Sequence, residues 1–237
     1  ITYTITVNPG PNVTVPANIT VCNGATIAAS NFTSTTPGAT FSWTNSDASI
    51  GLASSGTGNT PSFTGTNNTS FPVTATITVT PSASGCPGTP ASYTITVNPT
   101  PVVVVPANVT ACNGANVATG VFSSTTPGTT FAWANSTPSI GLAASGTGNT
   151  PSFTGTNNTA NPVTATVTVT PTANGCQGTP ISYTITVNPT PVVVVPANVT
   201  VCNGANVAAG VFTSTTPGTT FAWTKSTTTR GIAASGT

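Results

Sequence analysis

Apolar and hydroxyl-bearing residues alternate strictly in several short segments of the chain. Residues 74–80 read TATITVT, and residues 92–98 read SYTITVN, so that every second side chain is apolar. Phe41 and Trp43 occupy alternate positions in the same way. A period of two is typical of a strand that buries one face. The pattern therefore predicts half-buried antiparallel strands, and we identify no segment with the period of a helix.

Turn-forming dipeptides separate these segments at short intervals. They are Asn23-Gly24, Pro37-Gly38, Asn67-Asn68 and Pro87-Gly88. Glycine, proline and asparagine favour turns because of their backbone freedom, their fixed φ or their short polar side chain. Short strands joined by frequent turns predict an all-β fold, and specifically an antiparallel β-sandwich.

The whole pattern recurs with a period of 90 residues. Trp43, Trp133 and Trp223 are 90 positions apart, and GTGNTPSFTGTNNT stands unchanged at 56–69 and 146–159. This period is too long for most solenoid repeats and matches a complete immunoglobulin-like domain. The fold class predicted is all-β, with tandem immunoglobulin-like β-sandwich repeats of 90 residues.

The repeat also predicts the domain boundaries. Each unit ends in SYTITVNP, and the chain opens with the similar TYTITVNP. We expect residues 1–9 to be the last strand of a preceding repeat, which either completes that repeat or pairs with a neighbouring chain. Repeat 1 then spans 10–99, repeat 2 spans 100–189, and 190–237 is a partial repeat 3. The chain is interpreted as a window on a longer polypeptide.

The junctions between repeats are rich in proline. NPTPVVVVP stands at 98–106 and again at 188–196. Proline fixes φ, so these segments should be extended and stiff. We expect consecutive repeats to form a semi-rigid rod.

Two cysteines occur in each complete repeat, 64 residues apart. We predict a disulfide between Cys22 and Cys86 and another between Cys112 and Cys176, with the partner of Cys202 beyond the end of the chain. The alternative is a set of free buried thiols. A repeat with so little charge fits a secreted protein, and disulfides persist in the oxidising compartments that such proteins occupy.

Charged residues make up only 1% of the chain. Asp47 is the one carboxylate side chain, Lys225 and Arg230 are the cations, and histidine is absent. Binding to nucleic acid needs basic side chains against phosphate, so this partner is excluded. The apolar runs are too short for membrane insertion by helices.

Residues 100–189 form a complete repeat without any aspartate, glutamate, lysine, arginine or histidine. General acid–base catalysis needs such groups, and calcium sites need several carboxylates. We therefore expect no enzyme activity, no metal and no cofactor.

Three further features could support binding. Asn-X-Ser/Thr triplets are possible glycan-bearing positions; they begin at Asn12, Asn18, Asn31, Asn67, Asn68, Asn108, Asn135, Asn157 and Asn198. The recurring tryptophan is either a core residue or a sugar platform, and its alternation with phenylalanine favours the core. Rows of threonine at 74–80 and 94–96 are either ordinary exposed strand positions or a carbohydrate- or ice-binding face.

Units that end in YTITVNPTP and begin with a Cys-Asn-Gly turn resemble a known group of domains. They are similar to the PKD-like and immunoglobulin-like tandem repeats of large secreted proteins of Bacteroidetes. The resemblance covers the whole chain and implies a structural or adhesive role at the cell surface, as in adhesin stalks or gliding-associated proteins. The partners that it implies are neighbouring repeats or copies of the chain in a filament, with a surface glycan as a further possibility.

Overall fold

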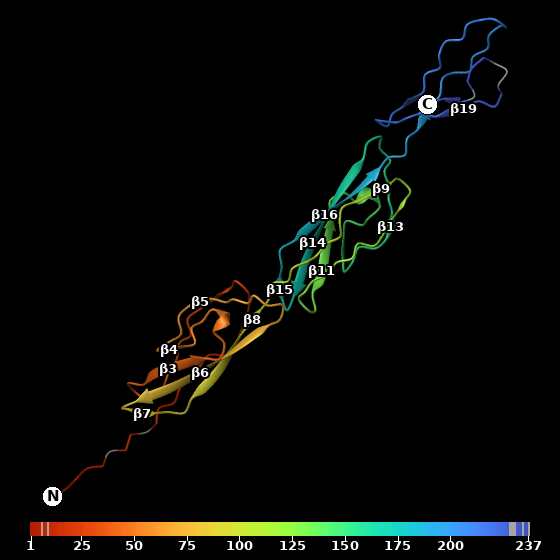
Figure 1. Ribbon diagram of the computed structural model, residues 1–237. Coiled ribbons are helices and arrows are strands. Elements are labelled where there is room, and N and C mark those ends of the chain that lie inside the picture. Colours follow the sequence, from red (N-terminus) through yellow and green to blue (C-terminus); the bar gives the residue numbers. More distant parts are fainter. Residues whose placement is uncertain (6, 9, 228–230, 234, 237) are drawn as a thin grey trace. The chain divides into compact units, whose positions relative to one another are not determined.

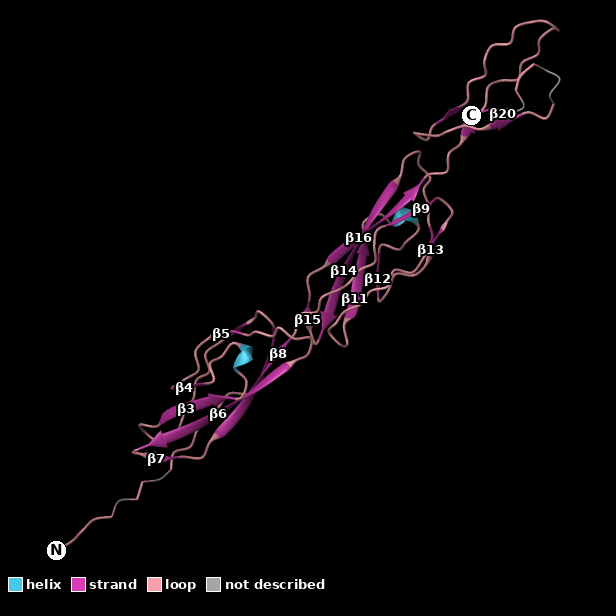
Figure 2. Cartoon of the chain, in the orientation of Figure 1, coloured by secondary structure: helices cyan, strands magenta, loops and turns pink. Residues whose placement is uncertain are grey.

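The computed structural model describes residues 1–237 apart from 6, 9, 228–230, 234 and 237. It confirms the predicted fold class, because repeats 1 and 2 each form a β-sandwich from the same series of strands (Figure 1). Each of these two repeats also contains one short 3-10 turn, Ala48–Ile50 or Pro138–Ile140. Loops connect the strands over much of the chain (Figure 2).

Contacts divide the chain into two compact units. The first comprises Ile1–Val104, Phe122–Ala132 and Thr170–Ile181, and the second comprises Val105–Val121, Trp133–Val169 and Ser182–Thr237. The first unit therefore contains all of repeat 1 and one end of repeat 2. We call this end of repeat 2, residues 122–132 and 170–181, its entry end.

Repeat 1 has eight strands. In chain order they are β1 (Ile19–Cys22), β2 (Thr26–Ile27), β3 (Thr40–Asn45), β4 (Ser55–Thr57), β5 (Phe63–Thr64), β6 (Val73–Ala83), β7 (Cys86–Pro87) and β8 (Ala91–Asn98). The main sheet has the order β1-β8-β6-β3-β4, and β7 forms a hairpin with β6. The opposite layer is thin, with the β2–β5 pair and a bridge between Thr14 and Thr33.

One pairing in the main sheet departs from the antiparallel arrangement. β1 lies parallel to β8, with Ile19 opposite Ile95 and Cys22 opposite Asn98. Both strands therefore end at the same edge of the repeat, where the chain leaves for repeat 2. This arrangement brings Cys22 to the exit end of its own repeat.

The alternating residues of the long strands fill the core of repeat 1. Ile77, Val79, Ile95 and Val97 are completely buried, as the period of two predicts. A polar group closes one side of this core, where the Tyr93 hydroxyl donates to Ser30 Oγ at 3.0 Å. All residues of this core cluster belong to repeat 1, so its hydrophobic stabilisation is internal to the repeat.

Repeat 2 reproduces these elements. They are β9 (Val109–Cys112), β10 (Asn116–Val117), β11 (Thr130–Asn135), β12 (Ser145–Thr147), β13 (Phe153–Thr154), β14 (Val163–Ala173), β15 (Cys176–Gln177) and β16 (Ile181–Asn188). The main sheet has the order β12-β11-β14-β16-β9, and β15 pairs with β14. β9 is parallel to β16, which places Cys112 opposite Asn188.

The segment from 190 to 237 forms two small strand pairs. These are β17 (Val193–Val194) with β18 (Thr213–Ser214), and β19 (Trp223–Thr224) with β20 (Ser235–Gly236). Val193 is 52% exposed, whereas its equivalent Val103 in repeat 2 is 1% exposed.

The predicted strand at the beginning of the chain is not paired. Residues 1–5 and 7–8 form no strand, and Tyr3, Ile5 and Val7 are exposed. That these residues form the last strand of a preceding repeat remains a prediction.

Candidate functional site

A disulfide bond links the two complete repeats. Cys22, the last residue of β1, is bonded to Cys176, the first residue of β15, with their Cα atoms 5.6 Å apart. Both residues belong to the first compact unit. The bond closes a sequence separation of 154, which is the separation within a repeat plus one full period.

The predicted pairs within each repeat are therefore wrong. Cys22 stands beside Asn98 at the end of β8, whereas Cys86 precedes the first residue of β8, Ala91. An eight-residue strand is about 25 Å long, whereas disulfides need Cα atoms within roughly 7 Å. Cys22 and Cys86 consequently lie at opposite ends of the repeat and cannot bond. The same geometry excludes the pair Cys112 and Cys176.

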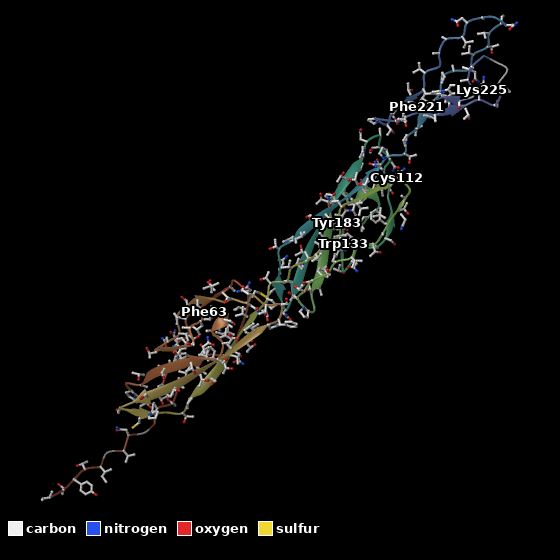
Figure 3. All side chains as sticks on the ribbon, viewed as in Figure 1. Phe63, Cys112, Trp133, Tyr183, Phe221 and Lys225 are labelled. Carbon is white, nitrogen blue, oxygen red and sulfur yellow. A yellow bond between two sulfur atoms is a disulfide. The ribbon has the colours of Figure 1, made fainter. Side chains whose placement is uncertain are left out.

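Cysteines 86, 112 and 202, all in described parts of the chain, are unbonded. Cys112 and Cys202 are exposed, and Cys86 is half-buried. Cys112 ends β9 at the exit end of repeat 2 (Figure 3).

Polar contacts surround the disulfide within the first unit. Asn98, which is 8% exposed, donates from Nδ2 to the Asn174 carbonyl at 3.0 Å. Asn174 adopts a positive φ of 51° in the turn between β14 and β15, and its side chain is exposed. The hydrogen bond and the disulfide thus join the exit end of repeat 1 to the entry end of repeat 2 at two points.

A glycine holds the connecting segment close to this turn. A Cβ atom on Gly178 would overlap the Pro101 carbonyl oxygen and lie 2.8 Å from Pro171 Cγ. Gly88 stands against Pro11 in the same way in repeat 1. The proline-rich segment that begins each repeat therefore packs directly against the hairpin that carries its second cysteine.

Three of the possible glycan-bearing asparagines are structural. Asn67, Asn135 and Asn157 are 5%, 6% and 4% exposed. Asn67 donates from Nδ2, the atom that carries an N-linked glycan, to the carbonyls of Phe71 and Val97 at 2.8 and 2.7 Å. Both amide hydrogens are thus used inside the fold, and these three positions cannot carry glycans in the folded repeats.

The other triplets lie on the surface. Asn12, Asn18, Asn31, Asn68, Asn108 and Asn198 are exposed. Several of them hold loops through the side-chain oxygen; Asn18 Oδ1, for example, accepts from the Thr94 backbone at 2.9 Å. Glycans at these exposed positions remain a prediction.

The predicted threonine rows do stand on neighbouring strands. In repeat 1, β6 pairs with β8 so that Thr74 faces Thr96 and Thr76 faces Thr94. The hydroxyls of Thr74 and Thr96 are hydrogen-bonded to each other at 2.8 Å, and those of Thr164 and Thr186 repeat the contact at 2.9 Å. Each such pair has used part of its hydrogen-bonding capacity within the sheet.

The tryptophans of the complete repeats are core residues. Trp43 and Trp133 are 4% and 5% exposed, and they pack closely against Gly56 and Gly146. Trp133 lies inside repeat 2 with Tyr183 (Figure 3). This arrangement confirms the core assignment and leaves neither indole available as a sugar platform.

Ionisable side chains do not gather anywhere in the described residues. Nowhere there do three or more histidine, cysteine or acidic side chains stand together as they would around a metal ion. Asp47 caps the 3-10 turn, and hydrogen bonds from the Ser49 hydroxyl and backbone lower the pKa of its carboxyl group. Lys225 donates to the Ile232 carbonyl, and Arg230 lies outside the described residues.

None of the helices in the described part of the chain is long and apolar enough to cross a membrane.

Comparison with solved structures finds chains of low sequence identity and low structural similarity. Human mucin-like protocadherin EC1-2 is 8% identical, with 76% of this chain and 98% of that chain aligned at a TM-score of 0.41. Drosophila N-cadherin EC1-4 is 12% identical, and the alignment covers 77% of this chain and 50% of that chain at a TM-score of 0.42. A chain in the complex of Dpr2 Ig1-Ig2 with DIP-Theta Ig1-Ig3 is 13% identical, and the alignment covers 79% of this chain and 70% of that chain at a TM-score of 0.42.

No curated protein matches the chain. A model of the PKD-like domain matches residues 19–101 and again residues 109–191. The two matches start 90 residues apart, in register with the sequence repeat, and cover more than half of the chain. The chain therefore belongs to the PKD-like domain family, of which it contains two tandem copies.

Proposed function

We propose that this chain is a structural part of an extracellular array, either the stalk of an adhesin or the subunit of a surface filament, and that it has no catalytic role. The observation that carries the proposal is the Cys22–Cys176 bond. It joins one repeat to the next, whereas the core of repeat 1 is complete without it. A bond in this place adds little to the repeat itself and adds continuity to a series of repeats.

The compartment follows from the same bond. Disulfides persist in secreted and surface proteins and are rare where glutathione keeps thiols reduced. We therefore place the protein outside the cell, in agreement with the surface repeats of Bacteroidetes that its sequence resembles.

The chemistry of the surface supports a passive role. Repeat 2 has no acidic, basic or histidine side chain, so it offers no general acid or base. A depression beside β3 is lined by residues such as Phe41, Ser42 and Thr57, none of which is charged. Hydroxyl and amide groups are suited to contacts between neighbouring repeats or copies of the chain, without repulsion between like charges.

The location and the assembly are tested on the source cells. An antibody against repeat 2 should label intact cells, and a protease added outside should remove that label. Electron microscopy of the native material should show fibres or stalks that persist when salt is raised, because there are few charges to screen. Labelling only after cell lysis, or fibres that dissolve in salt, would contradict the proposal.

The threonine rows supply the second candidate, which is a carbohydrate- or ice-binding face. Its supporting observation is the pairing of hydroxyl residues across β6 and β8. Glycan arrays and thermal hysteresis measured on the purified chain test this function. If binding or thermal hysteresis is seen in the wild-type protein and is lost in the Thr76→Val and Thr94→Val variants, the threonine face is the binding site.

A further inference from the structure

Two of the unbonded cysteines occupy the same repeat positions as the bonded pair. Cys112 is the equivalent of Cys22, one period later, and Cys86 is the equivalent of Cys176, one period earlier. Each complete repeat thus has one bonded and one free cysteine. The free ones stand at the exit end of repeat 2 and at the entry end of repeat 1.

The backbone around Cys112 is arranged as it is around bonded Cys22. Cys22 is opposite Asn98 and Cys112 is opposite Asn188, in the same parallel pairing. In both repeats the residue after the cysteine donates its N–H to that asparagine's carbonyl at 2.8 Å. The cysteine carbonyl accepts from an alanine three residues on, at 3.0 Å in both. The exit end of repeat 2 therefore has the form that holds a disulfide in repeat 1.

The backbone around Cys86 likewise matches that around bonded Cys176. Cys86 pairs with Ala83 and Cys176 with Ala173, each closing a hairpin. The turn residues before the two cysteines share positive φ angles: 50° and 77° in repeat 1, and 51° and 78° in repeat 2. The entry end of repeat 1 thus has the same backbone form as the entry end of repeat 2.

Each bonded position is more buried than its free equivalent one period away. Cys176 is 1% exposed, whereas Cys86 is half-buried; Asn98 is buried, whereas its equivalent Asn188 is half-buried. Bonded Cys22 is half-buried, whereas its equivalent Cys112 is exposed.

We propose that Cys86 and Cys112 each form an inter-repeat disulfide of the same kind as Cys22–Cys176. Their partners are the complementary cysteines of further PKD-like repeats of this type. Cys112 takes a cysteine equivalent to Cys176 from the repeat that follows, and Cys86 takes one equivalent to Cys22 from the repeat that precedes. This inference deepens the proposed structural function and rests on it for its biological purpose.

The bond forms by ordinary thiol–disulfide exchange. Two S–H bonds are broken and one S–S bond is made, which releases two protons and two electrons. A disulfide oxidant, such as oxidised glutathione or a disulfide-bonded oxidoreductase, accepts the electrons and is itself reduced to two thiols. A thiolate attacks the oxidant's disulfide, and the second cysteine resolves the mixed disulfide.

The loops of chain that these bonds close overlap along the sequence, because each bond joins one repeat to the next. Tension would pass from Cys22 to Cys176 through the bond, along the 26 residues to Cys202, and into the next bond. Twenty-six extended residues span about 90 Å, whereas two repeats without bonds would extend to about 600 Å. The series could not be drawn out into an unfolded chain without breaking covalent bonds.

A lengthened chain tests the pairing rule. A copy of residues 100–189 is inserted after Pro189, with the exposed changes Asn116→Gln and Gln177→Asn as mass markers in the copy. The protein is oxidised with glutathione and digested with pepsin, because the chain has only two sites for trypsin. Mass spectrometry should find Cys22 bonded to Cys176, and Cys112 bonded to the inserted equivalent of Cys176.

The unmodified chain, treated in parallel, is the control and should contain the Cys22–Cys176 bond with cysteines 86, 112 and 202 open to alkylation. A bond between Cys112 and Cys176, or Cys112 left free while Cys22 is bonded, would overturn the inference, as would a control without the Cys22–Cys176 bond. The surface labelling of cells tests the proposed function separately, because it does not depend on whether Cys112 is bonded.

Discussion

The Cys22–Cys176 bond makes a mechanical prediction that can be worked out from the structure. When the two ends of the chain are pulled apart, tension reaches Cys22, crosses the bond and continues from Cys176. The residues between these cysteines carry no load while the bond is intact. Replacing Cys176 by serine should expose all of them to the force.

The size of the effect follows from the sequence separation of 154. A fully extended chain spans at most 3.3–3.6 Å per residue, so the variant should extend by about 500–550 Å more than the oxidised wild-type protein. Because the core of repeat 1 is internal, the variant should still fold. The extra length should therefore appear as unfolding steps of intact repeats.

Single-molecule force spectroscopy on the chain, held at its two ends, measures this difference directly. Adding a reductant to the wild-type protein should produce the same gain in length as the substitution. Cys86→Ser is the matched control and should change nothing, since Cys86 is unbonded. Equal contour lengths for the oxidised wild-type protein and the Cys176→Ser variant would refute the reasoning.

Three further predictions concern the repeats themselves. Asn67→Ala should cost about 1–3 kcal/mol, because it removes the amide that donates to the Phe71 and Val97 carbonyls, whereas exposed Asn68→Ala should cost under about 0.5 kcal/mol; hydrogen exchange in β6 and β8, with β14 and β16 as internal reference, measures both. Gly146→Ala forces a methyl group into the buried tryptophan ring and should cost about 2–3 kcal/mol, against about 1 kcal/mol for Gly148→Ala, which meets only an unfavourable φ of 69°; chemical denaturation compares the two, and equal costs would contradict the packing. The lowered pKa of Asp47 stabilises the fold above its ordinary value of 3.8, and this contribution is lost as pH falls through the lower folded value, so Asp47→Asn should flatten the acid side of a stability–pH curve.

The sequence by itself determined the fold class, the repeat and the core. Alternation of apolar and hydroxyl residues is a local signal, because adjacent side chains of a strand point to opposite faces. It correctly predicted that Ile77, Val79 and the tryptophans of the two complete repeats are buried, and that the threonine rows face outward on neighbouring strands. A 90-residue period without insertions likewise sufficed to predict tandem domains.

The asparagine triplets show where local reading is insufficient. Asn67 and Asn68 begin overlapping triplets and look alike in the sequence, yet one is buried and donates to β8 while the other is exposed. Only the approach of a strand 30 residues away distinguishes them. A signal of three residues cannot contain that information.

The disulfide pairing was decided by tertiary structure alone. In a strict repeat, the first cysteine of each unit has one possible partner 64 residues on and an equivalent one a further period later, as Cys22 has Cys86 and Cys176, so spacing cannot choose between them. The choice depends on which end of the sandwich each cysteine reaches. The parallel placement of β1 beside β8 takes Cys22 to the exit end, and the β14–β15 hairpin takes Cys176 to the entry end. A disulfide forms only between cysteines that are close in space. Here the direction of the edge strand β1 brings Cys22 close to Cys176.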